Sequence, residues 1–353
     1  MGSDAAYTRA CDSIAQICRS HADARAVRLE ALAAIRRAVG FDAYAWLITD
    51  PETSVGSSPL ADVPCLPDLP RLIRLKYLTA INRWTGLPRG TVSLAAATGG
   101  ELSRSLMWRE LLHRYQVTDI ASSVYRDRFG CWGFLDLWRA QAPPFAAAEI
   151  QFLDRIAGPL TTALRHSQAM TFNPATGAGR LPAGPVVLLL SAALDVRAQT
   201  PQTQRYLRVL VPRDDEDQAP VPASAYNVAA QLIATEAGVD DGPPLARVHL
   251  ASGRWLTLRA GRMGDAQPAR ERDIAVTIEP AAPAERVSVF ARACGLTRRE
   301  TELLRQLATG AATRDIAQHM FVSEHTVQDH LKSIFTKTAA RNRRTLLARA
   351  LGA

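Results

Sequence analysis

Cysteine is scarce in this sequence, with five residues among 353, and none of them stands in a Cys-x-x-Cys pair. An odd number of widely spaced cysteines excludes a disulfide framework and a zinc-finger arrangement. Cys11, Cys18 and His21 are close enough in sequence to share one helix face and hold a metal ion. Cysteine in a helix is nevertheless more often a small core residue. We therefore expect no metal site and no cofactor.

Long apolar runs are also missing from the sequence. No stretch approaches the roughly 20 residues that a helix needs to cross a bilayer. The first five residues, Met-Gly-Ser-Asp-Ala, contain no apolar segment of the kind found in a signal peptide. These two absences predict a cytoplasmic protein that makes no membrane contact.

Catalytic signatures are absent as well. The sequence has no Gly-x-Ser-x-Gly, no glycine-rich phosphate loop and no His-x-x-x-His metal pair. Its seven histidines are scattered, and nothing indicates the acidic pocket of a phosphorylated receiver domain. The sequence therefore does not predict an enzyme.

The composition indicates two or three folded domains, because 353 residues with 47% hydrophobic content can build more than one core. The net charge of +8 is uneven: residues 296–353 contain ten Lys or Arg against five Asp or Glu, and the residues before them 32 against 29. A cationic end on a nearly neutral chain is typical of a nucleic-acid binder with regulatory domains. A general richness in arginine is the alternative explanation.

Residues 313–336 have the pattern of a helix-turn-helix. A short apolar-faced helix is interrupted at Phe321 and Val322, and Ser323 can cap a second helix. The apolar back of that second helix consists of Val327, Leu331, Ile334 and Phe335. Its hydrogen-bonding front consists of His325, Thr326, Gln328, Asp329 and Lys332. An ordinary amphipathic helix facing water would show the same periodicity.

The flanking residues favour the helix-turn-helix reading. Upstream, Thr297 and Glu300 form a capping-box pattern, and Gly310 is a typical helix stop. Downstream, residues 341–351 offer another apolar stripe, made of Leu346, Leu347 and Ala350. The end of the chain is therefore predicted to be a compact all-α unit of four helices.

Several of these residues resemble the LuxR-type DNA-binding domain of bacterial transcription regulators, over residues 296–351. They are Leu296-Thr-Arg-Arg-Glu, Gly310, Arg314-Asp-Ile-Ala, Ser323 with Thr326-Val, His330-Leu-Lys and Lys337. The resemblance implies binding to double-stranded DNA as a homodimer, with RNA polymerase as a further partner. It also implies that the last helix, around Leu346, Leu347 and Ala350, forms part of the dimer contact.

The resemblance further implies which side chains meet DNA. Gln328, Asp329 and Lys332 are expected at base edges. Thr313, Arg314 and Thr326 are expected near phosphates, and Ser323 and His325 complete the DNA-binding set. The sequence departs from the family at Gln328, where lysine is common, and at residues 339–340. Because glutamine bonds adenine bidentately whereas lysine favours guanine, a relative's target sequence does not transfer to this chain.

Residues 1–170 resemble a GAF domain, an α+β small-molecule sensor. The expected order is two helices over 5–39, a strand over 43–49, a loop over 50–70, helices over 72–84 and 104–115, a hairpin of strands 117–126 and 131–139, and a closing helix over 146–168. In such a fold the ligand cavity lies between the sheet and the helices that cross it. Its candidate wall residues are Trp46, Trp84, Trp108, Trp132, Phe134 and Trp138. Aromatic residues in half-buried strands are also common as ordinary core.

A second α+β domain is expected over residues 186–280, after a Pro- and Gly-rich linker over 171–185. Its order resembles a PAS domain: a strand over 186–190, a helix over 202–211, an acidic loop over 212–222, a helix over 224–237 capped by Ser224, a hairpin of 247–250 and 255–259 around residues 251–254, and a strand over 274–278. Residues 281–295 then form a helix that leads into the domain over 296–353. This connecting helix is either a transmitter between sensor and DNA-binding domain or a passive spacer.

The whole pattern predicts a multidomain transcription regulator that binds specific DNA and responds to a small molecule. Two alternatives remain open at this point. The sensor domains could serve only as a dimerisation scaffold, or the GAF-like half could carry out chemistry. The sequence does not identify the ligand, the operator, or whether the regulator activates or represses.

Overall fold

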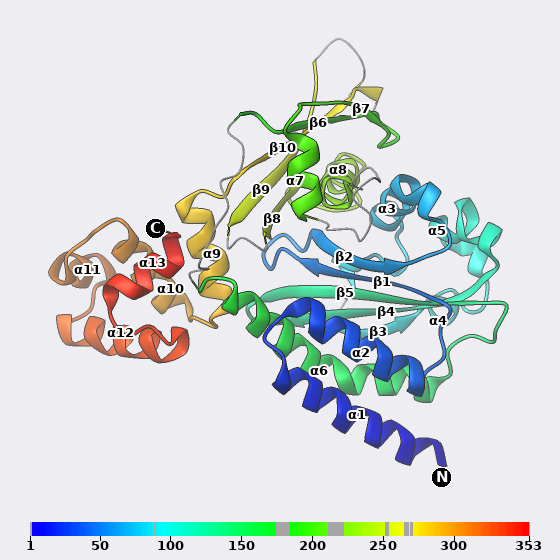
Figure 1. Ribbon diagram of the computed structural model, residues 1–353, viewed down its shortest axis with the longest axis horizontal. Coiled ribbons are helices and arrows are strands. Elements are labelled where there is room, and N and C mark those ends of the chain that lie inside the picture. The colour runs from blue at the N-terminus through cyan, green and yellow to red at the C-terminus, as the bar shows by residue number, and fades with distance from the viewer. Residues whose placement is uncertain are drawn as a thin grey trace.

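The protein is described here from a computed structural model, which describes residues 2–87, 89–173, 184–210, 222–250, 254–264, 268 and 271–352. Most of the predicted linker over 171–185 lies outside the described residues, as do nearly all of the acidic loop over 212–222 and most of the turn over 251–254. The described chain forms two units built on β-sheets and a helical unit at the carboxyl end (Figure 1).

The first unit is a sheet with helices on both faces (Figure 1). Among the described residues its antiparallel strands follow the order β2-β1-β5-β4-β3. The strands are β1 (Ala43–Thr49), β2 (Gly56–Asp62), β3 (Gly90–Ser93), β4 (Val117–Asp127) and β5 (Gly130–Ala140). Helices α1 (Gly2–Ser20), α2 (Ala24–Ala38) and α6 (Ala147–Met170) cover one face, and α3 (Leu69–Leu78), α4 (Leu94–Ala97) and α5 (Leu106–Glu110) the other.

Both faces of this sheet are buried, so apolar residues alternate between two cores. Along β1, Trp46 packs toward α1, α2 and α6, whereas its neighbours Ala45 and Leu47 pack toward α3 and α5. Strands buried on two faces carry nearly continuous apolar sequence, which is why residues 43–49 were predictable as a strand. The predicted helices over 5–39 and 146–168 and the hairpin are also confirmed.

Three predictions in the first unit are wrong. The helix expected over 72–84 ends at Leu78 as α3, and Trp84 begins a separate 3-10 turn, Trp84–Gly86. The segment over 50–70, expected as a loop, contains β2. Its Pro59 is tolerated because β2 is an edge strand, where a missing N–H donor costs no ladder bond. The helix expected over 104–115 is broken into α5 and two short 3-10 turns, Leu102–Arg104 and Leu112–Tyr115.

The second unit contains an antiparallel sheet whose described strands follow the order β7-β6-β10-β9-β8. They are β6 (Val187–Leu190), β7 (Val196–Gln199), β8 (Leu245–His249), β9 (Trp255–Arg262) and β10 (Ile274–Pro280), with helices α7 (Thr203–Leu210) and α8 (Ala223–Glu236). Counted within each unit, both sheets run second, first, fifth, fourth, third. The two units therefore share one sheet topology.

Helix α8 lies between the two sheets and packs on α3 and β2 (Figure 1). Ile73 and Tyr77 of α3 join Val228 and Ala229 of α8 in one apolar core. The prediction that Ser224 caps this helix is wrong, because Pro222 occupies the cap position and Ser224 is buried inside the first turn. The first two units thus meet through the packing of α8 on α3 and β2 and of β2 on β8.

The carboxyl-terminal unit is helical, as predicted. Its helices are α9 (Pro283–Ala293), α10 (Arg298–Ala308), α11 (Thr313–Met320), α12 (Glu324–Thr338) and α13 (Arg343–Leu351). The predicted capping box is confirmed, since Thr297 accepts the Glu300 N–H and Glu300 accepts the Thr297 N–H at 2.6 Å. In the parts of the chain that the structure describes, no helix is both long and apolar enough to span a bilayer.

Candidate DNA-binding surface and ligand cavity

The turn between α11 and α12 follows from local chemistry. Helix α11 ends at Met320, and Phe321 adopts a left-handed conformation with φ of 55°. The Ser323 Oγ accepts the N–H of Thr326 at 3.1 Å, so α12 begins with a satisfied donor. The sequence-predicted helix-turn-helix is therefore present.

Helix α12 buries its apolar back and exposes its polar front. Val327, Leu331 and Ile334 are buried against the other helices of the unit, in agreement with the predicted stripe. On the front, His325 and Lys332 are 83% and 73% exposed. Figure 1 shows α12 at the left end of the molecule, in the helical unit. Within the described chain, the His325 and Lys332 side chains of this front are accessible to solvent.

The exposed front carries a small charge network. The Lys332 Nζ lies 3.1 Å from the Asp329 Oδ1, and the His325 Nε2 lies 3.5 Å from the Asp329 Oδ2. The hydrogen bond from Lys332 holds the pKa of Asp329 below its ordinary value. Because these pairs are exposed, they orient the side chains and add little stability.

The remaining residues of the expected DNA-binding set lie around this front. Gln328 and Ser323 are exposed on α12 and its cap, and Arg314 is exposed on α11. Thr313 and Thr326 are half-buried, and the Thr326 hydroxyl pairs with that of Ser323 at 2.9 Å. These residues therefore all keep exposed or partly exposed surface on α11, α12 and the turn between them, and the predicted capping role of Ser323 is confirmed.

Glu300 of α10 holds α12 in place, a role that the sequence pattern did not reveal. Its carboxylate accepts hydrogen bonds from Ser333 Oγ at 2.6 Å and from Lys337 Nζ at 2.7 and 2.8 Å. Burial alone would raise the pKa of Glu300, but the bonds from Lys337, Ser333 and Thr297 outweigh it and lower the pKa to about 2. Glu300 was recognisable as half of a capping box, but its partners on α12 were not.

The residues assigned to a dimer contact are largely unavailable for one. Leu346 and Ala350 of α13 are fully buried inside the chain, where α13 packs on α9 and α10. Of the three residues, Leu347 alone keeps exposed surface. The assignment of Leu346 and Ala350 was wrong because their apolar character belongs to the intramolecular core.

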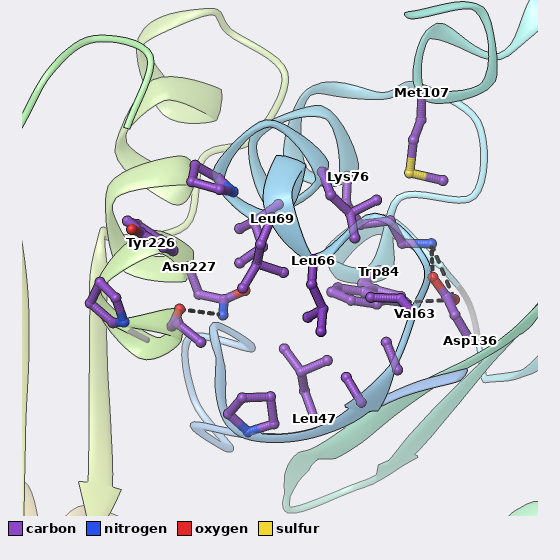
Figure 2. Close-up of a pocket in the computed structure, with 18 of the residues that line it drawn as sticks. Leu47, Val63, Leu66, Leu69, Lys76, Trp84, Met107, Asp136, Tyr226 and Asn227 are labelled. Carbon is purple, nitrogen blue, oxygen red and sulfur yellow. Dashed lines mark hydrogen bonds and ion pairs between the residues drawn. The ribbon is translucent and has the colours of Figure 1, made fainter. Parts of the chain in front are cut away.

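A cavity of about 740 Å³ lies between β1, β2, α3 and the first turn of α8 (Figure 2). Its walls are mainly apolar, with Leu47 and Val63 from the sheet side and Leu69 from α3. Tyr226 and Asn227 of α8 contribute the wall that belongs to the second unit. The size and the apolar lining are those of a small-molecule site, and the cavity spans both sheet units.

One end of this cavity is polar (Figure 2). The Lys76 Nζ lies 2.8 Å from the Asp136 Oδ2, and both side chains are 3% exposed. Trp84 Nε1 and Ser122 Oγ donate to the Asp136 Oδ1 at 2.9 and 2.6 Å. Burial lowers the pKa of Lys76 from its ordinary value. The ion pair is a fixed polar anchor beside an apolar chamber.

The predicted aromatic wall residues are distributed over several places. Trp84 and Trp138 line the cavity, and Phe134 stacks behind Trp84 with ring centroids 5.4 Å apart. Trp46 and Trp132 do not line it, because they point to the opposite face of the sheet, into the core with α2 and α6. Trp108 lies on a separate surface depression and donates to the Val117 carbonyl at 2.8 Å.

Charged residues join all three units at the β1–β2 turn. Asp50 is fully buried and accepts Arg247 Nε and Nη2, each at 2.7 Å, from the second unit. Glu52 accepts Arg247 Nη2 at 2.9 Å and, from α9, Ser288 Oγ at 2.9 Å. Arg292 of α9 lies 3.8 Å from Glu52. The turn therefore contacts the second sheet and the helix that leads into the DNA-binding surface.

An aromatic stack strengthens the same junction. Phe172, just after α6, stacks on Trp255 of β9 at 4.9 Å and meets Phe290 of α9 edge-on at 5.2 Å. Arg286 of α9 lies over the Phe172 ring and donates to the Arg349 carbonyl of α13 at 3.2 Å. Helix α9 is thus packed on both sides and is not a free spacer.

The cysteine-rich start of the chain shows ordinary packing. Cys11 and Cys18 lie partly buried against the first core, and burial raises the pKa of the Cys18 thiol to about 11. His21 pairs with Glu30 at 2.9 Å instead. Within the described ranges, no group of three or more His, Cys, Asp or Glu side chains is arranged to hold a metal ion.

Comparison with known proteins identifies the carboxyl-terminal unit. Residues 295–350 match the family described as bacterial regulatory proteins, luxR family. This match confirms the resemblance found over residues 296–351, so the unit is a LuxR-family helix-turn-helix domain.

Two curated proteins also match the chain over a short segment. The chain is 48% identical over 48 residues to the probable csgAB operon transcriptional regulatory protein of Salmonella typhimurium, and equally to the CsgBAC operon transcriptional regulatory protein of Escherichia coli. Each match covers 14% of this chain and 22% of the relative. The chain therefore spans about a fifth of the length of these curated relatives.

Solved structures give only weak overall likeness. A crystal structure of Escherichia coli SdiA aligns over 95% of this chain and 93% of that chain, at 13% identity and a TM-score of 0.33. A Vibrio cholera VqmA–ligand–DNA complex aligns over 49% and 83%, at 18% identity and a TM-score of 0.22. TM-scores this low establish no shared fold for the sheet units, and their GAF-like and PAS-like assignments stay predictions.

Proposed function

We propose that this protein is a transcription regulator that binds specific double-stranded DNA through α12 and responds to a small molecule held by its sheet units. The observation that carries the proposal is the exposed polar front of α12, set on a buried apolar back within a LuxR-family domain. A helix of this kind fits the major groove. The excess of basic residues over 296–353 supports attraction to phosphates.

Contacts to DNA divide into two classes. Gln328, Asp329 and Lys332 face base edges, where glutamine suits adenine, aspartate suits cytosine and lysine suits guanine. Thr313 and Arg314 face phosphates and set the position of the domain on the duplex. Two copies of the chain, bound as a homodimer, place their recognition helices about one duplex turn, or roughly 34 Å, apart. RNA polymerase is the further partner suggested by the family.

The sensor function rests on the cavity of about 740 Å³. Its apolar chamber and its Lys76–Asp136 anchor suit an amphiphilic small molecule with one polar end. The shared strand order of the two sheets supports two sensor units of common design, GAF-like and PAS-like. Because α8 forms one wall, a bound molecule contacts both units at once.

The contacts of α9 supply a physical route from sensor to DNA. Ser288 and Arg292 of α9 reach Glu52, and Phe290 reaches the aromatic ring of Phe172. A ligand that changes how the two sheet units sit together changes the surface on which α9 rests. This route favours the transmitter interpretation of the connecting helix over the passive spacer.

Selection of bound duplexes from a random library tests the DNA-binding part. We expect the purified full-length chain to enrich one sequence, arranged as two half-sites about one duplex turn apart. Binding with no enriched sequence at any salt concentration would contradict the proposal, because phosphate contacts alone carry no sequence information.

Thermal melting of the full-length chain against a panel of amphiphilic metabolites, with product analysis, tests the sensor part. We expect one compound class to raise the melting temperature without being converted, because a ligand that binds only the folded state stabilises it. Turnover of the compound would favour an enzyme. No shift with any compound would favour sensor units that serve only as a dimerisation scaffold.

A further inference from the structure

A second cavity, of about 480 Å³, lies on the other side of the contact between the two sheet units. The start of α2, the β1–β2 hairpin and the end of α6 line it from the first unit, and Arg247, Val248 and His249 of β8 line it from the second. It shares only Pro59 with the larger cavity. A larger share of its lining is polar than in the larger cavity.

Arg28 is the buried cation of this cavity. Its side chain is 5% exposed and forms no ion pair with any carboxylate of the described residues. Its Nε donates to the Ala24 carbonyl at 3.1 Å, and its Nη1 donates to the carbonyls of Trp46 and Ser58 at 3.0 and 2.8 Å. Its Nη2 makes no hydrogen bond within the described chain. Asp23 of the same cavity stabilises the guanidinium through space without forming an ion pair with it, so the buried charge is only partly compensated, which is costly.

Three more lining residues have buried polar atoms that lack a partner. They are Ser167 Oγ, Gln168 Oε1 and His249 Nε2, for which the described residues supply no hydrogen bond. The Ser167 and Gln168 side chains are 2% and 8% exposed. Burial lowers the pKa of His249 to about 4, with a further contribution from Arg286, so its ring is neutral at pH 7. Buried polar atoms in native proteins are nearly always paired, and such a cluster calls for an explanation.

We propose that this cavity binds a small monocarboxylate that carries a neighbouring hydroxyl or amino group. The Arg28 Nη2 and the Ser167 hydroxyl donate to the carboxylate. The Gln168 Oε1 accepts from the hydroxyl or amino group, and Asp23, at the mouth of the same cavity, favours that donor as well. Asp23 also disfavours a doubly charged anion such as phosphate, because its carboxylate repels the additional negative charge.

The position of the site makes its ligand an effector. The His249 ring lies 5.6 Å from the ring of Trp255, which stacks on Phe172 beside α9. A ligand against His249 therefore stabilises the aromatic stack that carries the connecting helix. The site itself does not rest on the proposed regulator function, because binding to it requires neither DNA nor the larger cavity.

Isothermal titration of the full-length chain with single compounds tests the site. The probes are the common L-amino acids, lactate and glycerate, with acetate and inorganic phosphate as controls. We expect saturable binding of at least one amino or hydroxy acid with one site per chain. Acetate lacks the donor and should bind at least about tenfold more weakly, the effect of losing one hydrogen bond in a buried site. Phosphate should also bind at least about tenfold more weakly.

Variants on α6 locate the binding. Gln168→Met keeps the side-chain length and removes the acceptor, and Ser167→Ala removes the hydroxyl. We expect each to weaken binding by about tenfold. Gln151→Met, on the exposed side of the same helix, is the matched control and should bind as the wild type does. Arg28 is left intact because its guanidinium also ties α2 to two strands. The proposal is overturned if no probe binds at millimolar concentration, or if both cavity variants bind like the wild type.

Discussion

Glu300 links two helices of the DNA-binding domain through one carboxylate. It caps the start of α10 and at the same time accepts hydrogen bonds from Ser333 and Lys337 of α12. The side chain is 3% exposed, so these bonds lie in a medium that screens them poorly. The orientation of the recognition helix therefore depends on the charge of this residue.

Replacing Glu300 with glutamine should lower the free energy of unfolding by about 1–3 kcal/mol at neutral pH, because charged hydrogen bonds become neutral ones. The pKa of Glu300 is lowered to about 2, so its contribution is complete above its ordinary pKa and is lost as the pH falls from about 4.5 toward 2. Urea unfolding at neutral and acidic pH measures both effects.

The control for this prediction is Glu302→Gln, on the same helix, whose partner Arg299 is largely exposed. An exposed pair contributes about 0–1 kcal/mol, so this variant should unfold nearly as the wild type does. If Glu300→Gln is as stable as the control at neutral pH, the role assigned to Glu300 is wrong.

Arg314 is proposed to contact a phosphate, a kind of contact that adds affinity without selectivity. Arg314→Ala should weaken binding to all duplexes by a similar factor and reduce the slope of log affinity against log salt by about one, because one phosphate contact is lost. Titrations at several salt concentrations measure the slope. Arg205→Ala, at an exposed position of α7, removes the same charge far from the DNA-binding surface and should leave the slope unchanged.

Among the elements, the β1–β2 turn has the widest influence. Asp50 and Arg247 are 197 residues apart in sequence, and their bidentate ion pair joins the two sheet units. Five donors converge on the Asp50 carboxylate, which is fully buried: the N–H groups of Glu52, Thr53 and Arg247, together with Arg247 Nε and Nη2. Removing Arg247 leaves the Asp50 carboxylate buried without a counter-charge, and removing Asp50 leaves Arg247 with only the partly exposed Glu52 as its partner.

Asp50→Ala should therefore destabilise the chain by about 3–5 kcal/mol. The double variant Asp50→Ala with Arg247→Met should cost less than the sum of the two single changes, since it leaves no orphaned charge. Urea unfolding of the wild type, both single variants and the double variant completes the cycle. If the loss of unfolding free energy in the double variant equals the sum of the losses in the two single variants, the pair does not couple the units.

Local signals explain which elements were predictable. The helix-turn-helix could be read from residues, because Thr297, Ser323 and Gly310 mark helix ends through their own chemistry. Strand β2 could not be predicted from its residues, since Ser57, Ser58 and Pro59 favour loops. This strand exists only by pairing with β1. Likewise α5 and its flanking 3-10 turns follow from tertiary packing rather than from sequence periodicity.

The candidate ligand site was only partly predictable for a related reason. In a sheet buried on both faces, apolar character does not reveal which face a residue occupies, so Trp46 of β1 and Trp138 of β5 look alike in sequence. Their cores are different in the structure. The wall supplied by Tyr226 and the anchor formed by Lys76 and Asp136 depend on long-range contacts that no local pattern records.

At the scale of the whole molecule, both cavities lie where the two sheet units meet, and α9 rests on the same junction. Ligand sites often lie between two structural units, because a ligand bound there contacts both units at once. The LuxR-family domain projects from the junction with α12 exposed (Figure 1). In the proposed function, this arrangement connects the cavities to the candidate DNA-binding surface and leaves that surface exposed.

Filling the larger cavity should separate sensing from DNA binding. Ala45 lies on its β1 wall, and Ala45→Phe should abolish the melting shift given by any compound that stabilises the wild type. DNA affinity without the compound should stay within about threefold, because the variant leaves the carboxyl-terminal domain intact. Ala148→Phe, at an exposed position of α6, is the matched control and should keep the shift. If Ala45→Phe still shows the melting shift, the compound binds outside the larger cavity.

The base preference of Gln328→Ala tests the central claim most directly. The full-length wild type and the variant compete for a set of duplexes that differ from the selected site by one base pair each. We predict that the variant loses about 1–3 kcal/mol of discrimination at one position of each half-site and keeps its preferences at the others. If every preference is unchanged, α12 does not read bases through Gln328 and the account of the DNA-binding surface is wrong.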